Sequence, residues 1–342
     1  MTRMLRSAFV LSVFALRAPL AQQQPPAVSE AELVRRLASA LDSLSKRDDF
    51  AGAVLLVKGD RTVFEHAYGF ADRERRIPNT VATAFNIGSI NKVFTATAIR
   101  QLAALGKLDL DGTLAAAWPD YPNQPVARAV TIRQILAMRS GIGGDIFAAP
   151  PGRTRQAVRD IGDYLKLVVN DTLHFTPGTR EEYSNAGYIV LGALIEHITG
   201  ASYYDYVRTH VYAPASMVGT AHYTSDSLPA GVAHGYTHMT DAGRDDGPLR
   251  PNLTTLPGRG SSAGGGYSIM HDLARYVAAL RAGAVPSGGG AGIGVLGGAP
   301  GLNAALEGGL PGGYDLVVMA NLDPPAAGSV GRLVRGWLGA RD

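Results

Sequence analysis

The chain has 342 residues, of which 46% are apolar and 18% are charged, and its formal net charge is +3 at pH 7. This composition supplies a sizeable buried core and excludes a largely disordered chain. The lysines and arginines form no run typical of nucleic-acid binding, so nucleic acid is not an expected partner, and the lack of cysteine excludes disulfides, thiolate metal sites and cysteine nucleophiles.

The first residues have the pattern of a secretory signal peptide, predicted over 1–21. Arg3 and Arg6 form a basic segment, an apolar segment ends at Leu16, and Ala21 is a small residue placed to precede cleavage. The apolar segment is shorter than the roughly 20 residues that a membrane-spanning helix needs. A retained N-terminal helix is the alternative. Residues 22–29 read as a polar linker, and we expect export, to a periplasm, with no stable membrane anchor after cleavage.

The folded part begins with a helix and two strands. Ser29 opens a capping-box pattern, and Leu33, Leu37 and Leu41 follow at helical spacing. Two strand-like runs then meet at Gly59, where a Gly-Asp pair is typical of a hairpin turn.

Helical patterns fill the middle of the chain, and strands return near its end. Helices are expected after Ser89 and in the segments 131–138, 163–169, 188–200, 203–212, 270–283 and 330–338, and an antiparallel strand pair at 303–309 and 314–321. This order predicts an α+β fold, with an antiparallel sheet built from both chain ends, flanked by helices, and a mostly helical insertion.

Ser89 and Lys92 form the first candidate for catalytic chemistry. Residues three apart on a helix share one face, so the Lys92 amine can take the proton of the Ser89 hydroxyl if it is desolvated. A serine at a helix N-terminus also lies beside free backbone N–H groups that suit a developing oxyanion. The same spacing recurs at Ser43 and Lys46, late in a solvated helix. Only Ser89 follows a strand and turn and opens an apolar helix, which favours it.

A second candidate lies in the sequence PGTREEYSNAGYIVLG. It places Tyr183 and Asn185 after a Pro-Gly turn and directly before an apolar helix. A tyrosine here can relay a proton, and an asparagine amide can hold both a lysine and a substrate carbonyl. The alternative for Tyr183 is a buried core phenol with a satisfied hydroxyl.

Together these segments resemble the β-lactamase-like serine hydrolases, which include class C β-lactamases, penicillin-binding D-alanyl-D-alanine carboxypeptidases and related carboxylesterases. FNIGSINKVFTATAI is similar to the S-x-x-K segment of that family, PGTREEYSNAGYIVLG to its Tyr-x-Asn segment, and SSAGGGYSIMHDLARYVAAL to a later loop and helix. The resemblance runs from about residue 30 to the end, and we expect a hydrolase domain over 30–342. It implies a β-lactamase/transpeptidase-like fold, with a sheet subdomain over about 30–86 and 267–342 and a helical subdomain over about 87–266.

The resemblance also implies roles for individual residues. Ser89 would be the acylated nucleophile, Lys92 its proton acceptor and Tyr183 an acid and base, while Asn185 would position the substrate. The backbone N–H of Ser89 would be one oxyanion donor, and a second would come from the strand that holds the third family motif. No cofactor or metal is implied.

That third motif is where the sequence departs from the family pattern. The family has Lys-Thr-Gly or His-x-Gly on this strand, whereas here the matching residues are Val295, Leu296 and Gly297. Gly297 and Gly298 still allow close backbone approach to substrate, with Gly298 as the expected second oxyanion donor. The missing cation makes ester or amide cleavage a better expectation than efficient β-lactam hydrolysis. Arg259 is either its substitute or an ordinary solvated arginine.

Other motifs are weaker. Residues 260–264 match G-x-S-x-G, but no strand precedes them and the last histidine, His271, lies in a helix pattern, so a substrate-edge loop is the better interpretation. The G-x-G-x-x-G/A matches at 258–263 and 292–297 lack a strand–helix context, and the eight histidines show no metal-ligand spacing.

The sequence therefore predicts an exported serine hydrolase that forms an acyl-enzyme with a small ester, amide or peptide-like substrate. The alternative is a penicillin-binding or sensor-like relative that binds or acylates without turnover. Loss of the third motif supports that alternative, and the intact set of Ser89, Lys92, Tyr183 and Asn185 favours the enzyme. The sequence favours no particular oligomeric state.

Overall fold

The computed structural model describes residues 28–240, 243–245, 247–286 and 292–340. The expected signal peptide and most of the expected linker lie outside these residues. Of the linker, Val28 donates its backbone N–H to the carbonyl of Trp337 at 3.3 Å, and Ser29 caps the first helix. Across the described part of the chain, no helix combines the length and the apolar character needed to cross a membrane.

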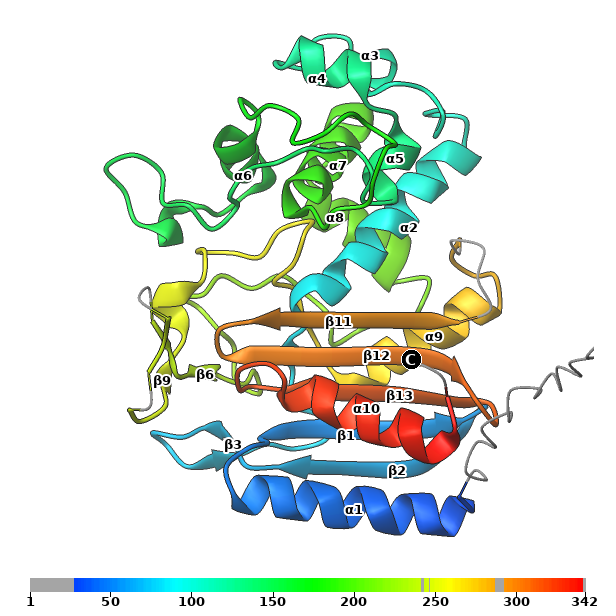
Figure 1. Cartoon of the computed structure of the whole chain (residues 1–342), viewed down its shortest axis with the longest axis vertical. Helices are drawn as coiled ribbons and strands as arrows, with labels where there is room; N and C mark the ends of the chain where they lie inside the picture. The colour runs from blue at the N-terminus through cyan, green and yellow to red at the C-terminus, as the bar shows by residue number, and fades with distance from the viewer. Residues whose placement is uncertain (1–27, 241–242, 246, 287–291, 341–342) are drawn as a thin grey trace, which may run out of the picture.

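A five-stranded antiparallel sheet forms the base of the molecule (Figure 1). Its strands come from both ends of the chain, as the sequence predicts. In spatial order they are β11 (Ile293–Ala299), β12 (Leu302–Leu310), β13 (Tyr314–Ala320), β1 (Gly52–Lys58) and β2 (Arg61–Tyr68). The hairpin between β1 and β2 turns at Gly59, whose φ of +59° suits glycine. This architecture confirms the expected fold class, and it leaves β11 as an edge strand.

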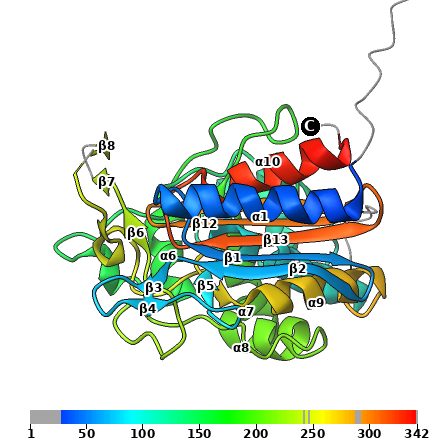
Figure 2. The same ribbon diagram turned by 90° about the horizontal axis from the view of Figure 1, so that it is seen from below.

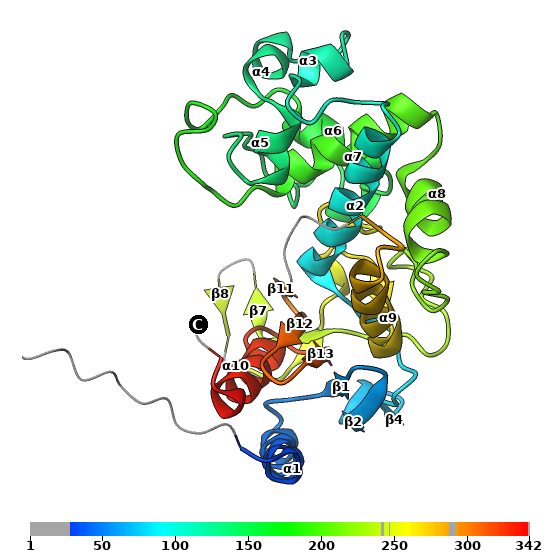
Figure 3. The same ribbon diagram turned by 90° about the vertical axis from the view of Figure 1, so that its right-hand side faces the viewer.

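Helices cover both faces of the sheet. Figures 2 and 3 show α1 (Glu30–Lys46) and α10 (Ala326–Leu338) on one face and α9 (Met270–Arg281) on the other. The alternation of β1 explains the two layers, because Val54 and Leu56 pack with α1 and α10 while the intervening residues pack in the core that includes α9. The residues of both cores are almost completely buried.

The remaining helices gather beyond the β11 edge (Figure 1). They are α2 (Asn91–Ala104), α3 (Leu114–Ala117), α4 (Gln124–Ala129), α5 (Ile132–Leu136), α6 (Ile161–Val168), α7 (Asn185–Thr199) and α8 (Tyr203–Val207), with a π-helical turn at Arg208–Tyr212. The two longest, α2 and α7, are buried along most of their length and pack against each other. Gly200, at φ +69°, ends α7 where the sequence predicts the stop.

The segment 213–266 differs from the expected helical insertion. Its described residues contain no α-helix, only a 3₁₀ turn at Leu253–Thr255 and the two-residue strands β6 (Tyr236–Thr237), β7 (Met239–Thr240), β8 (Gly243–Arg244) and β9 (Arg250–Pro251). Prolines and glycines recur throughout this segment, and they break helices by removing an N–H donor or by favouring other conformations. The other short strands are β3 (Phe70–Asp72), β4 (Ile77–Pro78), β5 (Phe85–Asn86) and β10 (Tyr267–Ser268), with β5 and β10 paired.

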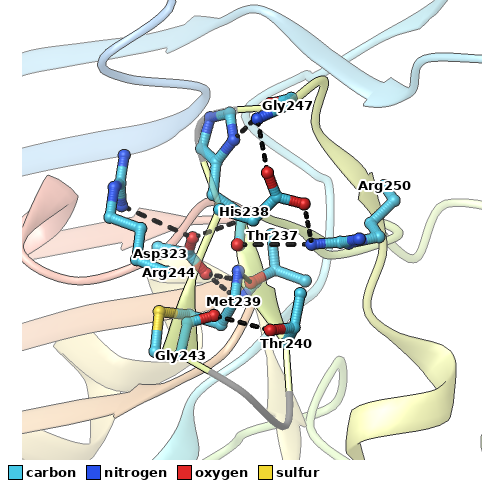
Figure 4. A network of polar contacts seen from close by, with 11 residues as sticks. Thr237, His238, Met239, Thr240, Gly243, Arg244, Gly247, Arg250 and Asp323 are labelled. Carbon is cyan, nitrogen blue, oxygen red and sulfur yellow. Dashed lines mark hydrogen bonds and ion pairs between the residues drawn. The ribbon is translucent and has the colours of Figure 1, made fainter.

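One buried carboxylate ties this loop region to the sheet (Figure 4). Asp323, just after β13, accepts hydrogen bonds from the Thr237 hydroxyl at 2.6 Å, the His238 backbone N–H at 2.8 Å and the Gly301 N–H at 2.7 Å. Its side chain is only 8% exposed. The three bonds hold the junction between β6 and β7 and the β11–β12 turn to the same point.

Replacing Asp323 with alanine is expected to lower the free energy of unfolding by about 2–4 kcal/mol, because three partly buried donors lose a charged acceptor. Urea unfolding followed by circular dichroism measures the change. Asp245 is a matched control, since it is an exposed aspartate in the same network that bonds Gly247 and Arg250. Asp245→Ala is expected to cost less than about 1 kcal/mol. Equal losses for the two variants would contradict the anchoring role of Asp323.

Candidate active site

Ser89 lies in a short 3₁₀ turn between a strand and a helix. The strand β5 ends at Asn86, the turn spans Gly88–Ile90, and α2 begins at Asn91. The α-helix therefore starts two residues later than the sequence pattern suggests, although the turn runs directly into it. Gly88, at φ +49°, allows the chain to bend sharply before the serine.

The amine of Lys92 is buried beneath Ser89. Its Nζ lies 3.2 Å from the Ser89 Oγ and 2.7 Å from the Asn185 Oδ1, and it donates to the backbone carbonyl of Ala263. The residue is only 6% exposed, and no carboxylate of a described residue contacts the amine. Desolvation disfavours the ammonium form and lowers the pKa of Lys92 to about 7.

Tyr183 reaches the same serine from the helical side. Its hydroxyl lies 2.5 Å from the Ser89 Oγ, and its ring centroid lies 4.7 Å from the Lys92 Nζ. More than half of Tyr183 is exposed, so it is not the buried core phenol of the alternative interpretation. Partial burial raises the pKa of Tyr183, and the phenol is therefore protonated at neutral pH.

The start of α7 fixes the positions of Tyr183 and Asn185. Ser184 caps the helix by accepting a hydrogen bond from the Gly187 N–H at 2.9 Å, and Asn185 is the first helical residue. The cap directs the two flanking side chains toward Ser89 and Lys92. The structure thus brings together all four side chains that the sequence singles out from two segments about 90 residues apart.

The edge strand β11 approaches Ser89 through its glycines. A Cβ on Gly297 would lie 2.0 Å from the carbonyl oxygen of Ile87, and a Cβ on Gly88 would lie 2.9 Å from the backbone nitrogen of Gly298. No side chain fits at Gly297, and its role is this close backbone contact. Gly298 lines the cavity in front of Ser89, and Gly297 does not. The backbone nitrogen of Ser89 lies 3.0 Å from the position of that Gly297 Cβ, so Gly297 and Gly298 bring β11 against the turn that carries Ser89.

Two cavities meet at the serine. Ser89, Tyr183 and Leu296 line both of them. The first, of about 310 Å³, extends under the loop 256–265 and has a largely apolar wall that includes Phe147. The second, of about 880 Å³, extends between α2, α9 and the start of β11.

The rival serines lie elsewhere. Ser262, the centre of the G-x-S-x-G match, is fully buried against α7, where a Cβ on Gly192 would lie 2.2 Å from its Oγ. His271 pairs with Glu65 at 2.7 Å and is not available as its base. Other residues of this loop line the first cavity, as expected for a substrate-edge loop. Ser43, in the second S-x-x-K match, accepts a hydrogen bond from Arg47 at 2.6 Å on the surface of α1.

Arg259 lies in the wall of the first cavity, but its guanidinium is held by neighbouring groups of the protein. Its guanidinium stacks on the Tyr204 ring, 3.6 Å from the centroid, and its Nε donates to the His222 carbonyl at 3.1 Å. Arg259 thus braces the loop against α8, whereas the sequence left it as either a substitute cation or a solvated side chain.

One group of side chains has metal-ligand chemistry. Potential ligand atoms of Asp72, Glu74 and His234 lie within 4.8 Å of one another. The backbone N–H of Arg75 donates to Asp72, and the Tyr236 hydroxyl donates to Glu74. None of the three lines either cavity at Ser89, so this group has no part in the chemistry there.

One contact of the site has no signal in the sequence. The Ala263 carbonyl completes the surroundings of Lys92, and a backbone oxygen can come from any residue type. Only the expectation of a substrate-edge loop at 260–264 indicated that this part of the chain lies near the serine.

A serine in contact with a buried, desolvated lysine and with a tyrosine, in a cleft between a sheet edge and a group of helices, defines the site of a serine hydrolase. Comparison with known proteins agrees. The chain belongs to the Beta-lactamase family, whose family model matches residues 37–332.

Individual relatives support this assignment. The chain is 30% identical over 205 residues to penicillin-binding protein 4* of Bacillus subtilis (strain 168), a match that covers 58% of this chain and 44% of the relative. The chain spans about a third to a half of the length of the curated relatives it matches. A penicillin-binding protein from Bacillus halodurans has a solved structure with a TM-score of 0.75 and 29% identity, covering 86% of this chain and 98% of that chain. The D-amino acid amidase of Ochrobactrum anthropi SV3 shares the fold, with a TM-score of 0.74 and 24% identity over 90% of this chain and 98% of that chain.

Proposed function

We propose that the protein hydrolyses a small ester, amide or peptide-like substrate through an acyl-enzyme on Ser89. The observation that carries this proposal is the hydrogen bonding of Lys92. A neutral amine has two N–H donors and one lone pair. The oxygens of Asn185 and Ala263 take the two donors, which leaves the lone pair for the hydroxyl proton of Ser89.

In the acylation step, Ser89 Oγ attacks the substrate carbonyl carbon while its proton passes to Lys92. The carbonyl oxygen becomes an oxyanion, which the backbone N–H groups of Ser89 and Gly298 stabilise. The pKa of Lys92 near 7 suits a base at neutral pH, because the amine is partly unprotonated before the attack and can hold the proton afterwards.

Tyr183 completes the proton transfers. As the bond to the leaving group breaks, the phenol donates its proton to the leaving oxygen or nitrogen, and the proton held by Lys92 restores the phenol. Water then attacks the acyl-enzyme and gives up a proton to Tyr183. Lys92 passes a proton to the Ser89 Oγ as the acid leaves, which regenerates the hydroxyl. Asn185 holds both the lysine and the substrate amide or ester in place.

The first cavity and β11 indicate the kind of substrate. Aromatic and aliphatic side chains, among them Phe147, Tyr223 and Leu296, form the wall of this cavity and suit an apolar group next to the scissile carbonyl. Val295 brings no charge to the site where the family pattern has lysine or histidine. We therefore expect ester or amide cleavage to be faster than β-lactam hydrolysis.

Parallel assays with p-nitrophenyl butyrate and nitrocefin test this proposal. The expected result is steady ester turnover, with a kcat/KM for nitrocefin lower by at least about a hundredfold. Nitrocefin carries a carboxylate that the missing cation would bind, whereas the ester is uncharged and does not need that cation. Nitrocefin turnover comparable to that of a dedicated β-lactamase would contradict the substrate assignment. Stoichiometric labelling by penicillin without turnover of either compound would instead indicate a sensor.

We further propose that the protein is exported. Support comes from the basic and apolar segments within residues 1–21 and from the lack of cysteine, which leaves the chain unaffected by an oxidising compartment. Fractionation of cells that make the full chain tests this, with a shortened protein in the periplasmic fraction as the expected result.

A further inference from the structure

The second cavity at Ser89 has a positively charged wall. Its basic residues are Lys92, Arg100 and Arg281, and no described residue of its wall is acidic. Residues 287–291, which follow the wall residue Pro286 in the chain, also contain no acidic residue. A cavity of this charge next to a nucleophile favours an anionic ligand.

Only one of the three basic side chains is available to a ligand. Arg281 donates to both carboxylate oxygens of Asp315, at 2.7 and 2.9 Å. Lys92 is committed to Ser89, Asn185 and Ala263, as described above. Arg100, by contrast, makes no hydrogen bond or ion pair with any residue that the structure describes, although it is half-buried.

Two buried tyrosines share the cavity wall with Arg100. Its charge acts on Tyr188 and Tyr276, which line the same wall; burial raises the pKa of each phenol to about 12, and the nearby guanidinium opposes that rise. The two hydroxyls already have partners, the Leu136 carbonyl and the Thr97 hydroxyl. They line the cavity around the guanidinium and leave its donors for a ligand.

The position of Arg100 follows from the helix. Ser89, Lys92, Val93, Ala96, Thr97 and Arg100 all line the second cavity and form one continuous face of the turn and α2. Eleven residues at 1.5 Å each separate the Cα atoms of Ser89 and Arg100 by about 16 Å, and the N-terminal tilt of the arginine brings its guanidinium to about 10 Å from the serine. Val295 lines the same cavity from β11.

We propose that Arg100 determines substrate specificity by binding a carboxylate of the substrate, about 10 Å from the scissile carbonyl. This deepens the proposed function and rests on it. Arg100 of α2 thus provides the positive charge that β11 lacks at Val295, at a greater distance from the serine. The substrate class is then a monoanionic ester or amide whose charge is separated from the reacting carbonyl by a chain of about seven bonds.

Equilibrium binding to the non-hydrolysing Ser89→Ala variant tests the proposal independently of turnover. Two ligands are compared by titration calorimetry, monomethyl suberate with its charge on the acyl side and 7-acetoxyheptanoate with its charge on the leaving-group side. Each is paired with its uncharged methyl ester. We expect at least one anion to bind more tightly than its ester, and Arg100→Gln to weaken that anion's binding by roughly ten- to a hundredfold more than it weakens the ester's.

Two further variants separate charge recognition from a structural role. Arg100→Lys keeps the charge but not the planar fork, and is expected to retain part of the anion preference. Arg128→Gln is the matched control, because Arg128 is an exposed arginine of α4 whose guanidinium bonds Gln124 and which lines neither cavity. It is expected to leave the Kd of every ligand unchanged.

The outcomes distinguish the two proposals. An anion preference that survives Arg100→Gln, or no preference for either anion, overturns the role of Arg100 whether or not the wild-type protein is a hydrolase. Loss of the preference in Arg100→Gln supports that role. If the wild-type protein fails to hydrolyse p-nitrophenyl butyrate and every ligand above, the proposed function fails instead.

Discussion

Replacing Ser89 with alanine is expected to lower kcat/KM for p-nitrophenyl butyrate by at least about a thousandfold, because no other serine or threonine among the described residues contacts Lys92. The fold should be unaffected, since the partners of this hydroxyl in the described part of the chain are Lys92 and Tyr183. Steady-state kinetics measure the loss, and thermal unfolding by circular dichroism verifies that the variant is folded.

The chain contains its own control for this substitution. Ser43 has the same three-residue spacing to a lysine, Lys46, but bonds Arg47 on the surface of α1. Ser43→Ala is expected to leave kcat/KM within about twofold of wild type. Retention of activity in the Ser89→Ala variant, or an equal loss in Ser43→Ala, would show that the S-x-x-K spacing alone had misled the assignment.

Replacing Lys92 with methionine is expected to lower activity and to remove a pH dependence of the free energy of unfolding. Loss of the base should lower kcat/KM by about 10²- to 10⁴-fold. Burial lowers the pKa of Lys92 from 10.5 to about 7 in the folded state, so between these values the unfolded state binds the extra proton. The wild-type protein therefore loses stability as the pH falls through this window, and methionine removes that dependence.

The size of this effect follows from the slope of 1.36 kcal/mol per pH unit. Between pH 9 and pH 7, the free energy of unfolding of wild type should fall by about 2.3 kcal/mol relative to that of Lys92→Met, since the folded state is already half-protonated at Lys92 at pH 7. Below pH 7 the difference should level off, because both states are then protonated. Urea unfolding of the two proteins at a series of pH values measures it. A constant difference across this range would mean that Lys92 is charged in the folded protein.

Local pattern predicts the strands β1, β2, β12 and β13 and the main helices, whereas the edge strand β11 was expected only from the family resemblance. The apolar run of β1 and the helical spacing in α1 indicate these elements directly, and the position of Ser89 between a strand and an apolar helix separates it from Ser43. Tyr183 and Asn185 could be assigned to the same site only through the family resemblance, since nothing local relates segments about 90 residues apart.

The sequence could not predict burial, pKa shifts or side-chain partners that depend on contacts between distant segments. The burial that lowers the pKa of Lys92 depends on α7 and on the loop around Ala263, which reach it from distant parts of the chain. Arg259 has the right charge and loop position, yet its guanidinium stacks on Tyr204. Arg100 lies two helical turns beyond Lys92 on the same face of α2. Only the cavity that α9 and β11 complete shows that it lines the same space as Ser89.

The central claim is that Ser89 is the residue acylated by substrate. A fluorophosphonate, which reacts covalently with activated serines, tests this directly when the labelled protein is digested and the modified peptide is identified by mass spectrometry. The predicted result is a single adduct on Ser89, absent from the Ser89→Ala variant and formed more slowly in Lys92→Met. An adduct on Ser43 or Ser262, or no adduct on the folded wild-type protein, would contradict the account.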